Sequence, residues 1–386
     1  MTRRSFLLWS ALQSLLFPLE PSTTLSRGRA SKHLILIELR GGNDGLNTVV
    51  PYSDPLYRHS RPRIALPERE LLPLDSELAL HPSLAPLREI YERGELALVL
   101  GLGYPHPNRS HFRSIEIWDT ASGPESYLNS GWLESLEPSG SEPLKGIVLG
   151  GHAGPLSGAR HGVVRIDDPR SFLNRSKRIR AQIYPVGTNE ALNHLLQTEA
   201  EIRKSANLLQ RYLQHPRPLP VPFRPTPLGR QLQVAARLIC QGIPTPFFKL
   251  SFGSFDTHTH QLPKQARLLT ELSTGLETLR KNLMACGRWD ETLVMTYSEF
   301  GRRVAENASA GTDHGTAAPH FVLGGKVRGG RYGTQPSLRD LDGNGDLKYS
   351  TDFRALYHTI AADWLQAHSP RLKRFPKLSF LSSQTR

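Results

Sequence analysis

Residues 34–42 read Leu-Ile-Leu-Ile-Glu-Leu-Arg-Gly-Gly, a short apolar run that ends in a charged residue and two glycines. A run of this length and composition predicts a buried β-strand. Similar runs recur along the chain, and stretches with helical spacing of apolar residues separate them. The further predicted strands are 96–100, 147–149, 247–251, 292–297 and 320–323. The predicted helices are 84–93, 110–120, 189–213, 228–241, 261–286 and 352–368.

This alternation of strands and helices predicts an α/β fold in which helices cover a mostly parallel sheet. The proline-rich connection 216–227 is a candidate domain boundary. The strands before and after it have the same core-like character, however, and no repeat of fixed period is visible. We therefore expect a single α/β domain from residue 31 to residue 386.

The composition excludes several classes of protein. Among 386 residues, 38% are hydrophobic, which is enough for a sizeable core, and no apolar run approaches the ~20 residues of a membrane span. A transmembrane transporter, a collagen-like protein and a coiled coil are therefore excluded. The net charge of +13 is spread along the chain without a helix-turn-helix, zinc-finger or RNA-binding motif, so no nucleic-acid partner is expected.

The chain has two cysteines, Cys240 and Cys286. Two are too few for a disulfide scaffold or a zinc ribbon. Their spacing does not decide between a disulfide and two free thiols.

The first thirty residues have the pattern of an export signal. Arg3 and Arg4 precede an apolar stretch, 6–17, that is too short and too polar to span a bilayer. A pair of arginines in this position is typical of the twin-arginine signal, which exports folded proteins. The alternative is a basic terminus before an amphipathic helix. We predict a signal peptide over residues 1–30, cleaved near Ala30, and a periplasmic or extracellular location.

Acidic and imidazole side chains follow three of the predicted strands, at the edge where an open α/β sheet collects ligands. Carboxylates and imidazoles are the ligands that hold zinc, manganese or iron. Each group alone is also typical of a hydrogen-bonded turn, but three groups at one edge make a divalent-metal site an equal alternative. The groups are Asn43 and Asp44; then Asp256, His258 and His260; then Glu299 and Arg302, followed by Asp313, His314 and His320.

Ser110 begins the predicted helix 110–120 and has two interpretations of equal weight. Serine often caps a helix N-terminus. The same position offers free N–H groups and positive potential to a phosphate or sulfate ester, so Ser110 is also a candidate nucleophile. Asn108, Arg109 and His111 lie beside it and are candidate substrate contacts.

Residues 340–346, Asp-Leu-Asp-Gly-Asn-Gly-Asp, are similar to the start of a calcium-binding loop. The closing glutamate is missing because Thr351 stands at its position. We therefore predict a plain turn.

At these motifs the chain resembles the bacterial family called domain of unknown function 1501. The resemblance follows family order from about residue 33 to residue 366 and includes long, unusual motifs. The matching segments are the twin-arginine leader, 39–47, 104–112 with Trp118, 130–133, 255–258, 296–302, 311–315, 320–325 and 351–354.

That family is grouped with the alkaline phosphatase and sulfatase superfamily. The resemblance implies a three-layer α/β/α sandwich, alkaline phosphatase-like, with one or two divalent metals beside a nucleophile. The implied nucleophile is Ser110. The implied metal ligands are Asp44 (or Asn43), Asp256, His258 or His260, Asp313, His314 and His320.

One departure from the superfamily pattern concerns the segment after strand 292–297. In the superfamily, Asp-His-Gly ends a core strand directly, whereas here that strand runs into Glu299 and Phe300. Asp313 and His314 lie about a dozen residues later. Either Glu299 replaces the usual aspartate and Phe300 removes a ligand, or the intervening loop folds back.

Two functions follow from these features. The first is a metal-dependent hydrolase of phosphate or sulfate esters, in which His111 handles protons and Arg302 holds the anion. Its cofactor would be zinc, manganese or iron, and its partner a small anionic ester. The second is a catalytically degenerate relative that binds an envelope polymer or an exported protein. The metal content of the exported protein distinguishes them.

Overall fold

The computed structural model describes residues 32–136, 144–159, 162–176, 190–214 and 217–381. The chain divides into two units, Met1–Ser31 and Lys32–Arg386, and all described residues belong to the second. The predicted signal peptide, residues 1–30, lies outside the described residues and stays a prediction.

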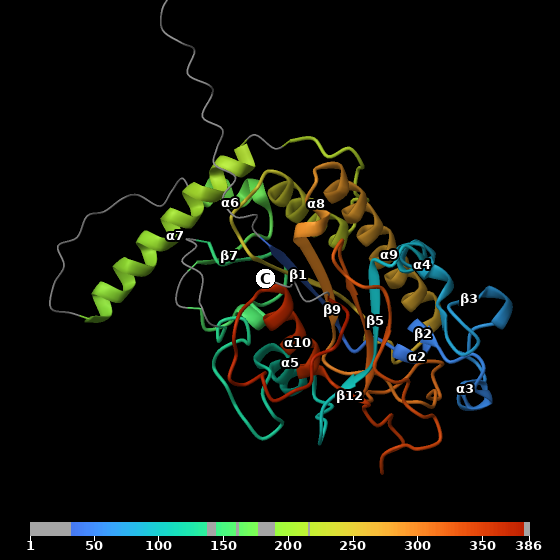
Figure 1. The fold of residues 1–386 in the computed structure, drawn as a ribbon. Coiled ribbons are helices and arrows are strands. Elements are labelled where there is room, and N and C mark those ends of the chain that lie inside the picture. The colour runs from blue at the N-terminus through green and yellow to red at the C-terminus, as the bar shows by residue number, and fades with distance from the viewer. Residues whose placement is uncertain (1–31, 137–143, 160–161, 177–189, 215–216, 382–386) are drawn as a thin grey trace, which may run out of the picture. The chain divides into compact units, whose positions relative to one another are not determined.

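The second unit is built on a sheet of nine strands in which β1 is central (Figure 1). The strand order is β11-β5-β10-β9-β1-β8-β6-β7, with β12 also paired to β5. All pairs are parallel except those made by β10, which runs antiparallel to β5 and β9. The strands are β1 His33–Arg40, β5 Leu96–Gly103, β6 Gly146–Val148, β7 Val163–Arg165, β8 Phe247–Gly253, β9 Thr292–Tyr297, β10 Ala318–Leu323, β11 Gly330–Tyr332 and β12 Thr351–Asp352.

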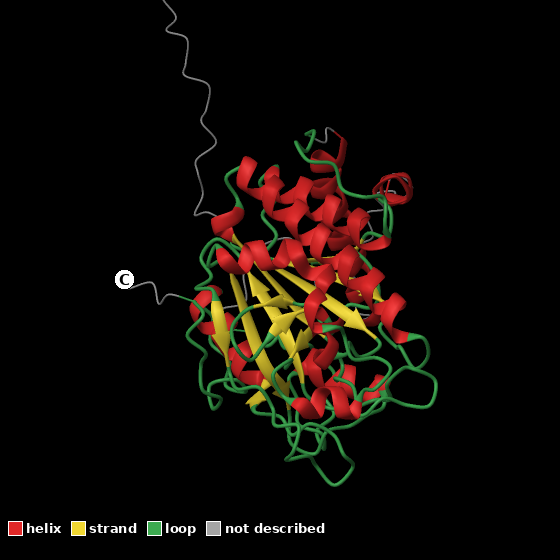
Figure 2. Ribbon diagram, turned by 90° about the vertical axis from the view of Figure 1, so that its right-hand side faces the viewer, coloured by secondary structure: helices red, strands yellow, loops and turns green. Residues whose placement is uncertain are grey.

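Helices cover both faces of this sheet, as Figure 2 shows with the strands in yellow between helices in red. The helices are α2 Gly45–Thr48, α3 Pro55–Ser60, α4 Ala85–Glu92, α5 His111–Thr120, α6 Pro169–Ser176, α7 Glu190–Gln214, α8 Pro227–Cys240, α9 Gln261–Ala285 and α10 Phe353–Thr359. Single 3₁₀ turns occur at Glu68–Glu70, Pro82–Leu84, Gly154–Leu156 and Trp289–Glu291.

The alternation of side chains along β1 explains the three layers. Ile35 and Ile37 point into a core shared with α4, α8 and α9, whereas Leu34 and Leu36 point into a second core shared with α5 and α10. Because successive side chains of a strand point to opposite faces, a strand that is apolar throughout needs cover on both sides. The predicted α/β/α sandwich with a mostly parallel sheet is confirmed.

Several parts of the architecture differ from the sequence analysis, which did not predict the short elements β7, β11, β12, α3 and α6. The predicted helix 352–368 is shorter, because α10 ends at Thr359 and passes into a π-helical turn, Ile360–Trp364. A small second sheet was not predicted; its strands, β2 Val49–Val50, β3 Leu72–Pro73 and β4 Ala79–Leu80, pair in the order β2-β4-β3. Strands of two residues carry too little periodicity to be seen in a sequence.

Cys240 and Cys286 form a disulfide that joins the ends of α8 and α9. The sequence left this pairing open. Disulfides persist mainly in oxidising compartments outside the cytosol.

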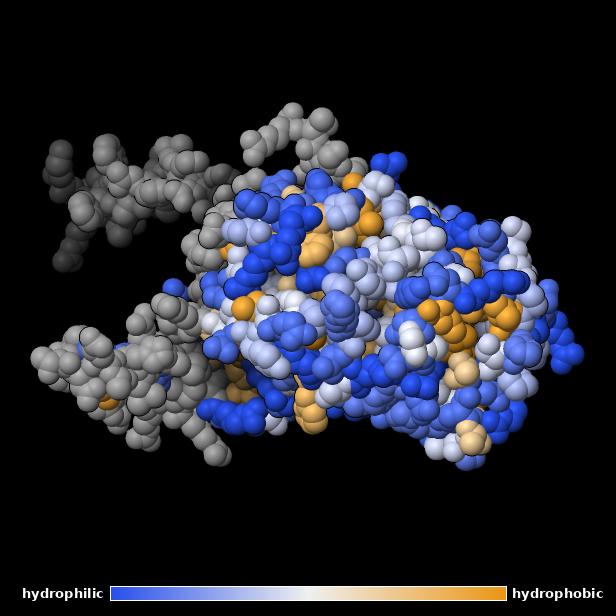
Figure 3. Space-filling view, turned by 90° about the horizontal axis from the view of Figure 1, so that it is seen from below, coloured by the Kyte–Doolittle hydropathy of each residue, from blue (hydrophilic) through white to orange (hydrophobic). Residues whose placement is uncertain are grey.

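The surface of the second unit is mainly polar on the face seen from below in Figure 3, where apolar residues are scattered among hydrophilic ones. Scattered apolar residues are ordinary on a protein surface. Among the described residues, none of the helices combines the length and the apolar character that crossing a membrane requires.

Strand register brings the candidate residues to one edge. Glu38 of β1 pairs with Ser251 of β8 on one side and with Tyr297 of β9 on the other. The three central strands therefore end together, and their following segments begin at the same edge of the sheet. The segments after β8 and β9 carry Asp256 and Glu299.

Candidate metal centre

Asp256 lies at the middle of the candidate site, in the segment that follows β8. The loop after β1 passes directly against it: Gly41 has φ +106, and a Cβ at that position would overlap the backbone N of Asp256. Only glycine tolerates both this conformation and this approach. Partial burial alone would raise the pKa of Asp256, but the guanidinium of Arg302 outweighs it and the pKa is lowered. The carboxylate is therefore charged at neutral pH.

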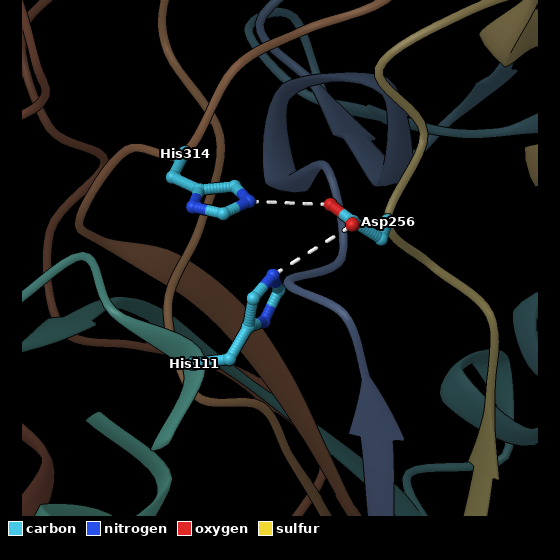
Figure 4. A group of neighbouring side chains, drawn as sticks. All are labelled: His111, Asp256 and His314. Carbon is cyan, nitrogen blue, oxygen red and sulfur yellow. Dashed lines mark hydrogen bonds and ion pairs between the residues drawn. The ribbon is translucent and has the colours of Figure 1, made fainter. Parts of the chain in front are cut away.

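Three imidazoles direct their Nε2 atoms at the carboxylate of Asp256. His258 Nε2 lies 3.0 Å from Oδ1, His314 Nε2 lies 3.2 Å from the same oxygen, and His111 Nε2 lies 3.7 Å from Oδ2. Figure 4 shows His111 and His314 reaching the two carboxylate oxygens from different segments. The Nε2 atoms of His258 and His314 are themselves 3.0 Å apart.

Each of these imidazoles also has an oxygen acceptor at its other nitrogen, Nδ1. The pairs are His258 with the Asp313 carboxylate (3.0 Å), His314 with the backbone carbonyl of Arg109 (3.0 Å) and His111 with the Glu299 carboxylate (2.9 Å). A carbonyl or a carboxylate can only accept, so Nδ1 can carry the proton of the neutral imidazole, which leaves the Nε2 lone pair available to a metal ion. This is the arrangement of metal-binding histidines, whose outer partners fix the tautomer.

Without a metal ion, an Nε2–H group can donate to the Asp256 carboxylate. With the protons on Nδ1, a cation between the Nε2 lone pairs and the carboxylate takes the place of those hydrogen bonds. First-row divalent ions bind nitrogen and oxygen at about 2.0–2.2 Å, so neighbouring ligand atoms in a tetrahedral site lie about 3.3–3.5 Å apart. The observed separations of 3.0–3.2 Å among Asp256, His258 and His314 lie just below that spacing, so these three atoms are near enough to share one ion. His111, Asp256 and His314 likewise offer ligand atoms within 4.8 Å of one another. The structure thus contains a candidate metal site.

His314 reaches this site because the loop after β9 folds back. Gly301 and Thr316 are joined by a 2.7 Å backbone bond, Gly315 donates to Gly301 at 3.0 Å, and Arg302 pairs with His314 in an antiparallel bridge. Of the two alternatives for this segment, the second is confirmed. Glu299 remains in the site as the partner of His111, and its Oε1 also accepts the N–H of Gly41 at 2.7 Å.

Arg302 joins the loops around the site by hydrogen bonds. Its guanidinium is buried and donates to the carbonyls of Gly41, Gly42, Phe255 and Thr312, and to Asp256 Oδ1 at 2.5 Å. The sequence analysis did not predict this structural role. The predicted contact of Arg302 with an anion stays a prediction.

Three predicted ligands lie apart from the imidazole cluster and have no described contact with it. Asp44 is buried and forms a bidentate ion pair with Arg61, at 2.6 and 3.0 Å. His260 is exposed and directly precedes α9. His320 is buried in the core beside the Trp118 ring, and burial lowers its pKa to about 3. Their metal-binding roles remain predictions.

Ser110 is exposed and stands in the sequence between Arg109 and His111, which both contact the site. The carbonyl of Arg109 holds His314, and the side chain of His111 holds Glu299. Ser110 stands at the N-cap position of α5, but its exposed side chain makes no capping hydrogen bond. The first helical bond is donated by the N–H of Ser114, at 2.9 Å, so the N–H groups of residues 111–113 have no acceptor within the helix.

Residues behind the cluster were missed by the sequence analysis. The Ser114 hydroxyl donates to the carbonyl of Glu299, and Tyr104 hydrogen-bonds Ser114 at 2.8 Å. This buried chain ties α5 to the end of β9. Ser114 follows His111 by three residues, the spacing that puts two side chains on one helix face, so the sequence did contain a signal for it.

The family comparison bears on most of this site. A family model described as "Protein of unknown function (DUF1501)" matches residues 177–373. The chain belongs to this family. The match confirms the family that the motifs predicted, and the DUF1501 range contains Asp256, His258, Glu299, Asp313 and His314. None of the curated proteins compared with the chain matches it.

Several solved structures are similar to this DUF1501 chain. Ps i-CgsB in complex with k-i-k-neocarrahexaose has a TM-score of 0.43 and 11% identity, over 90% of this chain and 74% of that chain. The PsFucS1 sulfatase from Pseudoalteromonas sp. has a TM-score of 0.37 and 10% identity, over 86% and 68%. A protein of the alkaline phosphatase superfamily from Vibrio parahaemolyticus has a TM-score of 0.34 and 11% identity, over 87% and 72%.

Proposed function

We propose that this protein is a metal-dependent hydrolase of phosphate or sulfate monoesters. The observation that carries the proposal is the convergence of three imidazole Nε2 atoms on the Asp256 carboxylate, with every Nδ1 atom held by an acceptor. With the protons on Nδ1, these nitrogen atoms and the carboxylate can face one metal ion.

Asp256, His258 and His314 would hold the metal, with His111 next to it. A bound zinc, manganese or iron ion would polarise an oxygen of the ester. Asp313 and the Arg109 carbonyl keep two of the imidazoles in the ligand tautomer.

The start of α5 supplies the groups that would meet the ester itself. Its unpaired N–H groups and the positive end of the helix dipole favour an anion at this point. Ser110 is the N-cap residue of the same helix, and its hydroxyl is the candidate nucleophile. Glu299 orients His111 through Nδ1, so that Nε2 faces the site and can hold a proton for the leaving oxygen.

We also propose export by the twin-arginine route, on the basis of Arg3 and Arg4. The disulfide between Cys240 and Cys286 supports a location outside the cytosol.

The test combines metal analysis with an ester screen and uses two histidines of one loop. His258→Gln removes a proposed ligand, whereas His260→Gln removes the alternative histidine of the same loop, which is exposed and has no described contact with the cluster. We expect the purified exported protein to hold about one equivalent of zinc, manganese or iron and to hydrolyse phosphate or sulfate monoesters. His258→Gln should lose both properties and His260→Gln neither.

A stable protein without metal or turnover would contradict the proposal. It would favour the alternative of a degenerate relative that binds an envelope polymer or an exported protein. Full activity in His258→Gln would show that His258 does not hold a metal needed for turnover.

A further inference from the structure

A cavity of about 360 Å³ opens next to the candidate metal centre. Aromatic side chains form much of its wall, and polar side chains lie among them. The wall includes Tyr104, Trp118, Phe300 and Tyr349, with Asn108 and Lys348. A cavity of this size lies at the lower end of the range for small-molecule sites.

Two residues of the cavity wall, Phe300 and Asn108, contact residues of the candidate site. The Phe300 ring lies 5.0 Å from the His111 ring and 4.6 Å from the His314 ring, measured between centroids. Asn108 accepts the N–H of Ser110 through its side chain at 2.8 Å. A group attached to an ester at Ser110 would therefore have the cavity beside it.

The walls are held in place before any ligand arrives. The Trp118 ring stacks on Phe353 with centroids 4.3 Å apart, and Tyr104 hydrogen-bonds Ser114 at 2.8 Å. Tyr349 closes the outer side and is 39% exposed. Gly103 lets it approach, because a Cβ at position 103 would lie only 2.7 Å from the Cβ of Tyr349.

We propose that this cavity binds the organic part of the ester, and that this part is a six-membered ring with an apolar face. The inference rests on the proposed hydrolase function and names its substrate class. Rigid aromatic walls favour flat or ring-shaped groups, because such groups bury apolar area with little loss of conformational freedom. A sugar ring and a phenol share this chemistry, whereas a two-carbon alkyl group would leave most of the cavity to water.

The test compares ring esters with a small alkyl ester in wild type and in two variants of Tyr349. The turnover probes are phenyl phosphate, glucose 6-phosphate and ethyl phosphate, together with the three corresponding sulfate esters. Phenylphosphonate and ethylphosphonate, which are not hydrolysed, are titrated by calorimetry as binding probes. Tyr349→Ala removes the outer ring of the cavity, and Tyr349→Phe is the matched control that keeps it. The partial exposure of Tyr349 makes both variants compatible with folding.

We expect Tyr349→Ala to raise KM for the ring esters, and the Kd of phenylphosphonate, about tenfold, since a ring loses one apolar contact surface. Tyr349→Phe keeps the aromatic ring and should therefore retain the preference of the wild type for ring esters over ethyl esters, which Tyr349→Ala should lose. A preference for phenyl phosphate would identify the ring as a phenol. A preference for glucose 6-phosphate would identify it as a sugar.

The outcomes separate the two proposals. Turnover of ring and ethyl esters with equal KM would overturn the cavity inference and leave the hydrolase function standing. A preference for phenylphosphonate that depends on Tyr349, without turnover of any ester, would support the cavity and overturn the hydrolase function. Failure of every probe to bind or react would overturn both.

Discussion

The Nδ1 atom of His314 donates a hydrogen bond to the backbone carbonyl of Arg109 at 3.0 Å, although 205 positions separate the two residues. The orientation of this imidazole therefore depends on the position of the segment before α5. The Arg109 side chain in turn pairs with the buried carboxylate of Asp346 at 2.9 Å, and Arg303 reaches the same carboxylate at 3.7 Å. Asp346 thus links the segment before α5, which contains Arg109, to the loop after β9, which contains Arg303.

We predict that Asp346→Asn lowers metal affinity about tenfold, the lower end of what outer partners of metal ligands contribute. Its effect on folding should be small, because Arg109 and Arg303 are partly exposed and water can solvate them. The control is Asp340→Asn in the same turn, whose carboxylate is exposed and pairs only with Lys348 among the described residues. Competition titration with a zinc chelator measures both variants. Equal affinity in the two would show that Asp346 has no positioning role.

The buried ion pair between Asp44 and Arg61 gives a second prediction. Asp44→Asn keeps the N-cap of α2 but leaves the Arg61 charge unpaired in the interior, which should cost about 3–5 kcal/mol of stability. Asp54→Asn is the matched control, since Asp54 caps α3 in the same way without a buried arginine. Denaturant unfolding measures the difference. If Asp44→Asn also loses metal while it stays folded, the predicted ligand role of Asp44 is supported over a purely structural one.

Three buried histidines predict how stability depends on pH. Burial lowers the pKa of His33 to about 4, of His81 to about 4 and of His320 to about 3, from an ordinary 6.5. Below pH ~6.5 the unfolded chain binds three protons that the folded protein does not. Their contribution to stability is complete above that pH and is lost as the pH falls, at about 4 kcal/mol per pH unit near pH 5.

The variant His81→Asn tests this prediction. His81 accepts the N–H of Ser83 at 3.0 Å, and asparagine can make the same capping bond without titrating. The slope of stability against pH near pH 5 should fall by about a third. His59→Asn, at an exposed position, should leave it unchanged. An unchanged slope in His81→Asn would show that carboxylates, not buried histidines, govern the acid transition.

The sequence predicted those features of the fold that are local. The β1 strand, the turn at Gly41 and α9 follow from apolar periodicity and glycine placement. The antiparallel direction of β10 does not, because strand direction depends on how the preceding segment crosses the sheet. The position of His314 likewise depends on backbone bonds between 301 and 316 that no periodicity signals.

The interior position of His320, by contrast, could be read from the strand pattern around it. Alternate residues of a strand face opposite sides, so His320 and Val322 share one face, while Phe321 and Leu323 point to the other core. That alternation places His320 against Trp118 in the interior. By contrast, nothing local indicated that Arg61 would pair with Asp44, since the partners come from different elements.

Export can be tested together with the disulfide. Replacing Arg3 and Arg4 by lysine should leave the protein in the cytoplasm, since the twin-arginine route requires the pair. Thiol labelling of the retained protein should find Cys240 and Cys286 reduced, whereas the exported protein should be protected from labelling. Normal appearance of the variant in the periplasm would contradict the twin-arginine assignment.

The final prediction concerns Ser110 and separates its two interpretations. Because the Ser110 side chain makes no capping hydrogen bond, Ser110→Ala should lower the free energy of unfolding by less than ~0.5 kcal/mol, the smallest loss typical of replacing an N-cap residue. If Ser110 is the nucleophile, the same variant should lose turnover of phosphate and sulfate esters while it keeps its metal, since Ser110 is not among the proposed ligands. Ser110→Thr retains a hydroxyl and should recover part of the activity. Thermal unfolding, metal content and ester hydrolysis are measured for both variants. Full hydrolysis by Ser110→Ala would exclude the nucleophile assignment and leave water as the attacking group.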